Sequence, residues 1–466
     1  MPQPPQLTVA WPGKADAEAL LGSRPRARWA RREADGAPGP ASGAASAEVR
    51  GASAVEAGPG GKAGEGSGGV RVTQDDNVLV EADNLEALWL LQDSHAGAVK
   101  VVYIDPPYNT GNALPYKDTF GQAGHAGWLS MMLPRLALTK DLLRSDGTVF
   151  VQVDDTESAY VTLLGNEIFG EENYLGAFVH QRAKGGGNAK RWVRGHDYIH
   201  VWARDITQVG PFVREKQPPA RYETIDGERY LVEDDFLRVS FGKYTRGSER
   251  RLMYEDIVSV RGEAKKAEID AGIAMGRYVL RPWGDTGKHA VVRLTPADRA
   301  SSKMYSIVKA LGETGRRDLE ALGLGGTFGY PKPVELLTTL VLSQTFEDRD
   351  AIVLDFFAGS GTTGEAVLAL NARDGGNRRF VLVQRPEALR PVAGARTGAE
   401  GTGGIRAAGD DAAEPIAFVP GTISALCRER VRRAGARLRA EHPELVTDFL
   451  DLTVVGEGPL PGEPEC

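Results

Sequence analysis

Apolar runs that end in an acidic residue and a turn constrain the fold of this chain most. Residues 99–104 form a β-branched run that stops at Asp105-Pro106-Pro107, as expected of a buried parallel strand ended by proline. Residues 128–143 carry apolar side chains at helical spacing, and a turn then leads into the apolar run 148–153. Strand patterns that alternate with helix patterns predict an α/β fold with a doubly wound, mostly parallel sheet.

A second strand leads directly into a glycine-rich loop. The apolar run 351–354 continues into Asp355-Phe356-Phe357-Ala358-Gly359-Ser360-Gly361-Thr362-Thr363, after which a helix and the strand 380–383 are expected. Glycines let the backbone approach a ligand closely, and a helix N-terminus offers free N–H groups. The loop lacks the full dinucleotide fingerprint and the lysine of a P-loop. It predicts a small-ligand site at the carboxyl end of the sheet, with a tight turn that binds nothing as the alternative.

The first strand ends in the motif Asp105-Pro106-Pro107-Tyr108. The two prolines form a rigid corner with unpaired carbonyls, so a carboxylate and a carbonyl can accept both hydrogens of an amino group. Tyr108 can stack on a planar base. These groups suit methylation of an exocyclic amine, which needs positioned acceptors rather than a strong base. A strand-ending turn with a surface tyrosine is the alternative.

Composition sets further limits. Residues 34–70 consist largely of Ala, Gly, Ser, Pro and Glu and hold much of the excess among the 57 glycines, so we expect them to be disordered. We see no apolar run of membrane length and no signal peptide, which favours a cytoplasmic protein without membrane contact. The two cysteines, Cys427 and Cys466, lack metal-ligand spacing, and no metal site is predicted.

The two motifs and the sequence around them resemble the β-class of DNA amino-methyltransferases, and most of all the modification subunits of type III restriction-modification systems. The resemblance is carried by residues 84–88, 102–111, 128–132, 146–155, 168–173, 196–198, 331–333 and 355–363, with 11–14 and 428–430 near the ends. The order of the motifs also agrees, since the Asp-Pro-Pro-Tyr motif precedes the glycine loop and a long insert lies between them.

The resemblance implies a seven-stranded sheet, S-adenosylmethionine as the cofactor, and methyl transfer to N6 of an adenine flipped out of double-stranded DNA. Asp105, Pro106, Pro107 and Tyr108 are then the catalytic residues. The implied cofactor-binding residues are Asp355, Phe356, Phe357, Ala358, Gly359, Ser360, Gly361, Thr362, Lys332 and Gln384. Many relatives carry glutamate where this chain has Gln384, which can still accept a hydrogen bond from a ribose hydroxyl.

The chain is acidic overall, with a net charge of −7, but residues 181–221 contain more Lys and Arg than Asp and Glu. A basic segment of this kind suits contact with DNA phosphates. The residues predicted to bind DNA are Asn109, Arg182, Lys184, Lys190, Arg191 and Arg194. A solvated charged face is the alternative for each of them.

We predict the following organisation along the chain. The segments are an N-terminal arm at 1–33, the disordered segment at 34–70, a first catalytic part at 71–183, a target recognition insert at 184–326, a second catalytic part at 327–392, a linker or loop at 393–415, and a helical segment at 416–466.

Two rival functions remain open. One is methylation of N4 of cytosine, against which Asp at the head of the motif argues because Ser is typical there. The other is a DNA-binding specificity subunit without catalysis, against which both intact motifs argue. The resemblance also implies a homodimer, and a restriction subunit with helicase and nuclease activity would be a separate chain.

Overall fold

The computed structural model describes residues 8–32, 70–111, 118–185, 192–216, 220–239, 251–389, 396–397, 405–406 and 420–456. The segment expected to be disordered lies outside these ranges except for its last residue, Val70. Two short strands, β16 (Arg396–Thr397) and β17 (Ile405–Arg406), pair within the segment expected to be a linker or loop.

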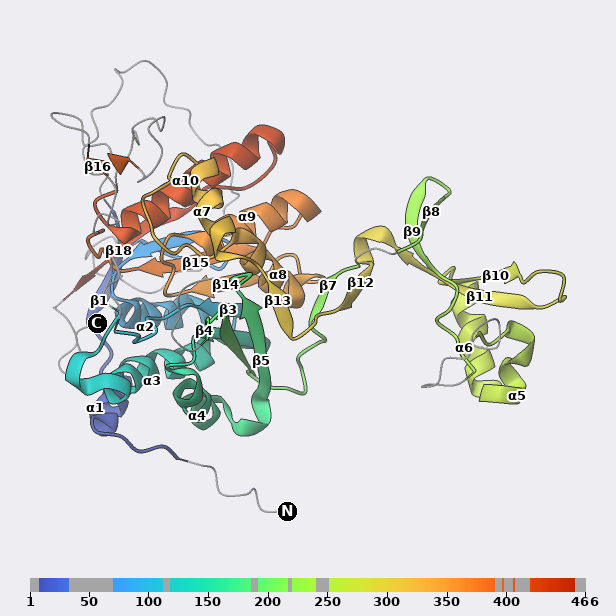
Figure 1. Ribbon diagram of the computed structural model, residues 1–466, viewed down its shortest axis with the longest axis horizontal. Coiled ribbons are helices and arrows are strands. Elements are labelled where there is room, and N and C mark those ends of the chain that lie inside the picture. Colours follow the sequence, from blue (N-terminus) through green and yellow to red (C-terminus); the bar gives the residue numbers. More distant parts are fainter. Residues whose placement is uncertain are drawn as a thin grey trace, which may run out of the picture.

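A large sheet forms the centre of the molecule (Figure 1). Within the described ranges it has ten strands, in the order β1 (Ala27–Arg31), β18 (Leu450–Gly456), β2 (Val78–Glu81), β15 (Arg379–Gln384), β14 (Ile352–Asp355), β3 (Val99–Ile104), β4 (Leu143–Val153), β6 (His196–Ala203), β5 (Tyr174–Gln181) and β13 (Ile307–Lys309). The run from β18 to β4 is parallel throughout, whereas β1 and β6 are antiparallel to their neighbours.

The α/β fold with a mostly parallel sheet is therefore confirmed, but the sheet is larger than the seven strands expected. The strands β1 and β18 extend one edge, and β13 extends the other. The segment at 416–466 was expected to be helical, yet after α10 (Ile423–Glu441) the chain returns as β18. β18 pairs with β2, about 370 residues earlier in the sequence, so no local pattern could reveal its partner.

Helices cover both faces of the sheet (Figure 1). One face carries α1 (Lys14–Ala19), α2 (Asn84–His95), α3 (Gly124–Leu142) and α4 (Ser158–Phe169), and the other carries α8 (Val334–Thr345), α9 (Thr362–Asp374) and α10. All six residues of β3 are buried. Val102 and Ile104 belong to the first core and Val101 and Tyr103 to the second, because successive side chains of a strand point to opposite faces.

A smaller module projects from this central body (Figure 1). It consists of β8 (Tyr222–Ile225), β9 (Glu228–Glu233), β10 (Tyr278–Pro282) and β11 (His289–Pro296) with α5 (Ile257–Arg261) and α6 (Glu263–Ala274), and it has its own apolar core. The ladder between β7 (Val213–Glu215) and β12 (Ser301–Lys303), here called the neck, joins it to the body. The bounds predicted for the insert, 184–326, include too many residues. β6 and β13 belong to the central sheet, and α7 (Gly312–Ala321) packs on α8.

In the described part of the chain, no helix combines the length and the apolar character that a membrane span requires.

Candidate active site

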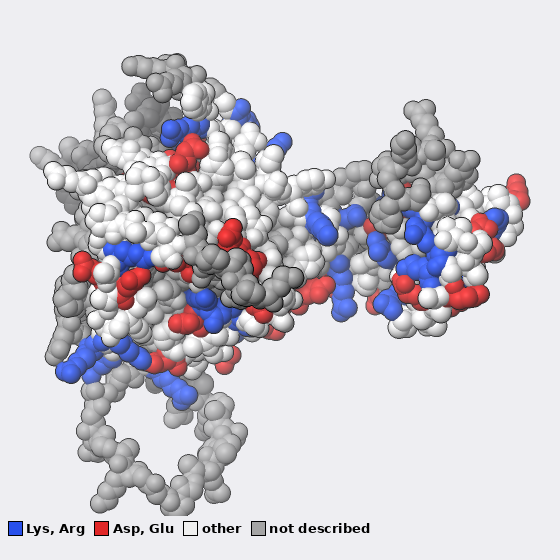
Figure 2. Space-filling view, turned by 90° about the horizontal axis from the view of Figure 1, so that it is seen from below, with Lys and Arg blue, Asp and Glu red and all other residues white. Residues whose placement is uncertain are grey.

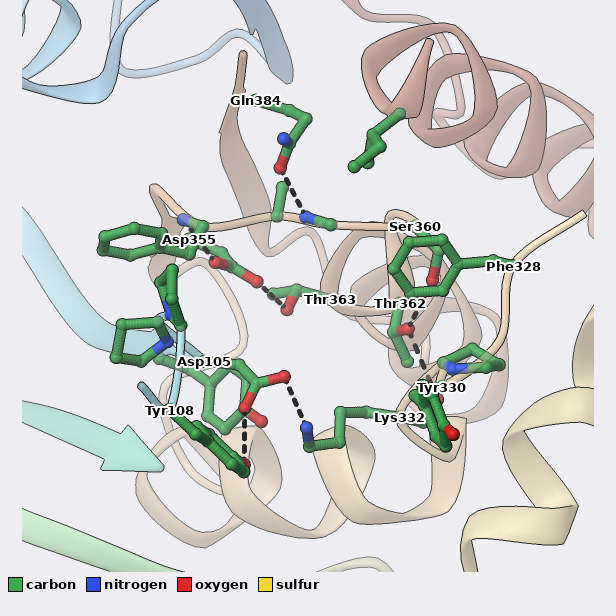
Figure 3. Close-up of a pocket in the computed structure, with 18 of the residues that line it drawn as sticks. Asp105, Tyr108, Phe328, Tyr330, Lys332, Asp355, Ser360, Thr362, Thr363 and Gln384 are labelled. Atoms are coloured by element: carbon green, nitrogen blue, oxygen red, sulfur yellow. Dashed lines mark hydrogen bonds and ion pairs between the residues drawn. The ribbon is translucent and has the colours of Figure 1, made fainter. Parts of the chain in front are cut away.

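Two strand ends meet at the middle of the sheet. β3 and β14 are neighbouring parallel strands, so Asp105, which follows β3, and Asp355, which ends β14, lie at the same edge. The chain continues from β3 to β4 on one side and from β14 to β15 on the other. Such a reversal opens a crevice at the carboxyl ends of the strands. A cavity of about 830 Å³ lies there, lined by both motifs (Figure 3).

Both carboxylate oxygens of Asp105 are engaged in this structure (Figure 3). Oδ1 accepts a hydrogen bond from the Tyr108 hydroxyl at 2.8 Å, and Oδ2 lies 2.5 Å from Nζ of Lys332. Burial, followed by the charges of Asp105 and Asp197, raises the pKa of Tyr108 well above its ordinary value. The phenol is therefore a neutral hydrogen-bond donor at physiological pH.

Two buried carboxylates hold the turn that follows the prolines. Asp118 accepts hydrogen bonds from the backbone N–H of Tyr108 at 2.7 Å and from the backbone N–H and hydroxyl of Thr110 at 3.0 and 2.6 Å. Asn109 has a left-handed backbone, with φ of 57°, and its side-chain amide donates to Glu157 at 2.7 Å. Trp128 donates its indole N–H to the carbonyl of Pro107 at 2.7 Å. The position of the tyrosine ring is thus fixed from several sides.

Asp355 links the end of β14 to the glycine loop. Its carboxylate accepts hydrogen bonds from the backbone N–H of Phe357 at 3.0 Å and from the hydroxyl of Thr363 at 2.5 Å. Burial raises the pKa of the Asp355 carboxyl to about 7 despite these hydrogen bonds. A ligand cation beside it would favour the ionised form.

Gln384, at the end of β15, also reaches the loop. Its Oε1 accepts a hydrogen bond from the backbone N–H of Gly359 at 2.7 Å, and its Nε2 donates to the carbonyl of Arg385 at 3.2 Å. The amide oxygen retains a second lone pair. Gln384 can therefore support the loop and still accept a hydrogen bond from a ligand hydroxyl.

Gly361 packs against α10 and not against the cavity. Its φ is 83°, and a Cβ there would lie 2.9 Å from the carbonyl oxygen and 3.1 Å from Sγ of Cys427. Gly361 was expected among the cofactor-binding residues, but it is absent from the cavity wall. Glycine is needed at this position for the left-handed backbone and for the close approach of the helix.

A buried arginine of α10 supports the loop from behind. Nη1 of Arg430 donates to the hydroxyls of Ser360 at 2.9 Å and Thr362 at 2.6 Å, and its Nε bonds the Glu365 carboxylate at 2.7 Å. The side chains of Arg430 and Glu365 are 0% and 3% exposed. The loop conformation therefore depends on a helix about 70 residues further along the chain.

The structure brings most of the predicted site residues together. Those that line the cavity are Asp105, Pro106, Pro107, Tyr108, Lys332, Asp355, Phe356, Phe357, Ala358, Gly359, Ser360, Thr362 and Gln384. Lys332 contacts both motifs, because its ammonium reaches Asp105 and its carbonyl accepts a hydrogen bond from Thr362 at 3.3 Å.

The residues predicted to bind DNA are more scattered. Arg182 lines the cavity, and its Nε lies 3.1 Å from Oδ1 of the buried Asp197. Arg194 is exposed and lies 3.5 Å from Asp155, and Lys184 is exposed. Asn109 supports the turn behind Tyr108. Lys190 and Arg191 lie outside the described residues.

Three residues of the site had no role assigned from the sequence. They are Asp118, Asp197 and Arg430. Asp197 and Arg430 belong to segments that carry the family resemblance, which was the one available signal. Asp118 is not part of a quoted motif, and only the structure shows its contacts with the turn.

Comparisons with known proteins agree with this geometry. The family model described as DNA methylase matches residues 99–390, more than half of the chain and both motifs. The probable type III restriction-modification enzyme HindVI Mod subunit of Haemophilus influenzae is 44% identical over 384 residues, which cover 69% of this chain and 50% of that protein.

Two further relatives have similar names. The type III restriction-modification enzyme EcoPI Mod subunit of Escherichia phage P1 is 28% identical over 377 residues, covering 67% of this chain and 58% of that one. The StyLTI Mod subunit of Salmonella typhimurium is 27% identical over 429 residues, covering 80% and 59%. The matched part spans only 50% to 59% of these three relatives. Because the family model covers both motifs and the strands that carry them, this chain belongs to the DNA methylase family.

Proposed function

We propose that this chain transfers a methyl group from S-adenosylmethionine to N6 of adenine in double-stranded DNA. The observation that carries the proposal is the position of Asp105 and Asp355 on neighbouring strand ends in one cavity. An acceptor set for an amino group and a loop suited to a nucleoside ligand therefore face each other.

The amine would be held by groups that follow β3. The Asp105 carboxylate and the Pro106 carbonyl can accept the two N6 hydrogens, and the Tyr108 ring can stack on the base. An exocyclic amine is a weak nucleophile because its lone pair is delocalised into the ring. Two acceptors on its hydrogens favour a pyramidal nitrogen and direct its lone pair toward the methyl donor.

The residues around the glycine loop fit S-adenosylmethionine chemically. Asp355 offers a carboxylate to an ammonium group, Gln384 offers an amide oxygen to a ribose hydroxyl, and the partly buried Phe357 can offer an aromatic ring to an adenine. Phe356 is 1% exposed and packs in the core beneath. When bound, the cofactor supplies an electrophilic methyl group. The part of this chain is to orient the donor toward Asp105 and to keep bulk water out of the crevice.

Duplex DNA would approach along the neck. Figure 2 shows Lys and Arg side chains gathered on the neck and on the adjacent side of the module. Arg214 stacks on Tyr305, which is 69% exposed, at 4.9 Å, and Lys303 is exposed beside it. Basic and aromatic groups of this kind suit phosphate contact and base stacking.

The whole assembly is also part of the proposal. Relatives named as Mod subunits of type III restriction-modification enzymes support a role as one subunit of a larger enzyme. We also propose, from the family resemblance alone, a cytoplasmic homodimer that works with a separate restriction subunit. Light scattering at micromolar concentration tests the dimer, and a mass near one protomer contradicts it.

Methyl transfer itself is tested with purified protein, labelled S-adenosylmethionine and unmethylated genomic DNA, followed by nucleoside mass spectrometry. We expect N6-methyladenine from the wild type and none from Asp105→Ala. Asp141→Ala, which changes an Asp whose side chain is 66% exposed, serves as the matched control. N4-methylcytosine would move the substrate to the rival base. Bound cofactor without any product would favour the specificity-subunit alternative.

A further inference from the structure

A second buried carboxylate lies beside the catalytic turn. Asp197, in β6, is 2% exposed and lines the same cavity as Asp105. Its Oδ2 accepts a hydrogen bond from Nε2 of Gln152 at 3.0 Å and lies 3.4 Å from the Tyr108 hydroxyl. The Tyr108 hydroxyl therefore has two carboxylates within reach, the nearer one being Asp105 at 2.8 Å.

Asp105 already has two donors before an amino group arrives. One of its oxygens is held by Lys332 and the other by Tyr108, so an incoming amino group competes with these donors for the lone pairs of the carboxylate. The ammonium–carboxylate contact is charge-assisted, and such hydrogen bonds are stronger than those of neutral donors. The neutral hydroxyl of Tyr108 is thus the weaker competitor, and it is the donor that an amino group displaces more easily.

Tyr108 is half-buried in this structure. Once a base covers its ring, a displaced hydroxyl needs an acceptor, because an unsatisfied buried donor is costly. Tyr108 cannot dispose of its proton, since burial and the neighbouring carboxylates raise its pKa well above the ordinary value. Burial alone would raise the pKa of Asp197. However, His180, Lys332 and Arg182 hold that pKa below its ordinary value, so Asp197 remains an anionic acceptor.

We propose that Asp197 receives the hydroxyl of Tyr108 when the adenine amino group binds Asp105. The hydroxyl turns from Asp105 to Asp197 with its proton, and no covalent bond forms or breaks. Asp197 is in this sense a positioning residue, since it acts through Tyr108 and does not touch the substrate. The inference rests on the proposed adenine methylation.

Asp197 also contacts Gln152 and Arg182, so a loss of activity on substitution does not by itself identify its role. A double-mutant cycle separates the two roles, because Tyr108→Phe keeps the aromatic ring but removes the hydroxyl that has to be placed. If Asp197 serves that hydroxyl, its substitution loses its effect once the hydroxyl is gone.

The experiment measures kcat and the KM for S-adenosylmethionine in the wild type, Tyr108→Phe, Asp197→Ala and the double variant, with saturating DNA. In the wild-type background we expect Asp197→Ala to lower kcat about tenfold to a hundredfold, which corresponds to one unsatisfied buried donor. The KM should stay within about twofold. In the Tyr108→Phe background the same change should lower kcat by less than about threefold. Asp197→Asn, which keeps an acceptor oxygen, should recover most of the loss.

Equal losses in both backgrounds would overturn the inference and leave Asp197 with the structural role of holding Gln152 and Arg182. The wild type distinguishes this failure from that of the proposed function. Without N6-methyladenine from the wild type, both are contradicted. With wild-type product and equal losses, only the role of Asp197 is contradicted. Calorimetric binding of S-adenosylmethionine to each variant verifies that the cavity is intact.

Discussion

The two glycines of the loop are predicted to respond differently to the same substitution, with the larger loss of stability at Gly361 and the larger loss of cofactor affinity at Gly359. Both have a left-handed backbone, with φ of 53° at Gly359 and 83° at Gly361. Their surroundings differ. A Cβ at Gly359 would meet nothing closer than the Phe357 carbonyl oxygen at 3.8 Å, whereas one at Gly361 would overlap the backbone of Cys427 at 2.9 Å. Alanine at each position therefore separates backbone strain from contact with α10.

The free energies follow from these distances. A left-handed non-glycine residue costs about 1–2 kcal/mol, which applies to both positions. Overpacking against a fixed backbone adds about 1–3 kcal/mol, and only Gly361 has that contact. We expect Gly361→Ala to lower the free energy of unfolding by about 2–5 kcal/mol, and Gly359→Ala by about 1–2 kcal/mol.

Urea unfolding followed by circular dichroism measures this difference. Cofactor affinity should show the reverse order, because Gly359 lines the cavity and Gly361 does not. Calorimetric titration with S-adenosylmethionine should give the larger loss for Gly359→Ala. Equal unfolding free energies for the two variants would refute the argument that α10 determines the residue at Gly361.

Three further predictions concern buried charge. Burial raises the pKa of Asp355 to about 7. The stability that comes from its protonated form is therefore complete below the pKa of unfolded Asp, about 4, and is lost as pH rises through about 7. Asp355→Asn should remove this loss, measured as the difference between urea midpoints at pH 5 and pH 8; the same difference in the variant and the wild type would contradict the assignment. Asp118→Ala frees the turn at Tyr108 and should lower kcat about a hundredfold with unchanged calorimetric affinity for the cofactor; a weakened affinity instead would place its effect elsewhere. Arg430→Met leaves the buried Glu365 carboxylate with fewer partners and should lower the free energy of unfolding in urea by about 3 kcal/mol. Adding Glu365→Gln should restore part of that free energy, and a double variant as unstable as Arg430→Met would contradict the ion-pair explanation.

Local sequence patterns predicted the strands and turns that carry the chemistry because those signals are contained in a few residues. Residues 99–104 were expected as a strand and form β3 unchanged. Lys332 contacts Asp105, which is 227 residues away in the sequence. This contact depends on how the segment before α8 packs over the crevice, and no local sequence pattern predicts that packing. The family resemblance placed Lys332 near the cofactor, and the structure adds its contact with Asp105.

Other features depend on pairings between distant segments. Gly361 was expected to face a ligand because glycine loops commonly do, yet its neighbour is Cys427 on α10. Asp197 is one of several acidic residues in a charged stretch, and its burial depends on the pairing of β6 with β4 and β5. The edge strand β1 pairs with β18, and β18 pairs with β2, so neither strand can be recognised without its distant partner.

The neck determines how the projecting module could be exchanged for another. The chain enters the module at β7 and leaves it at β12, and these strands are hydrogen-bonded to each other, so the two ends lie one strand spacing apart, about 4.8 Å. The module has its own apolar core. A different module with the same end spacing can therefore be grafted at Glu215 and Ser301 without re-threading the sheet that carries the chemistry. If the module recognises the DNA target, as proposed, new target sequences could be acquired by exchange of the module while the central sheet and its cavity stay unchanged.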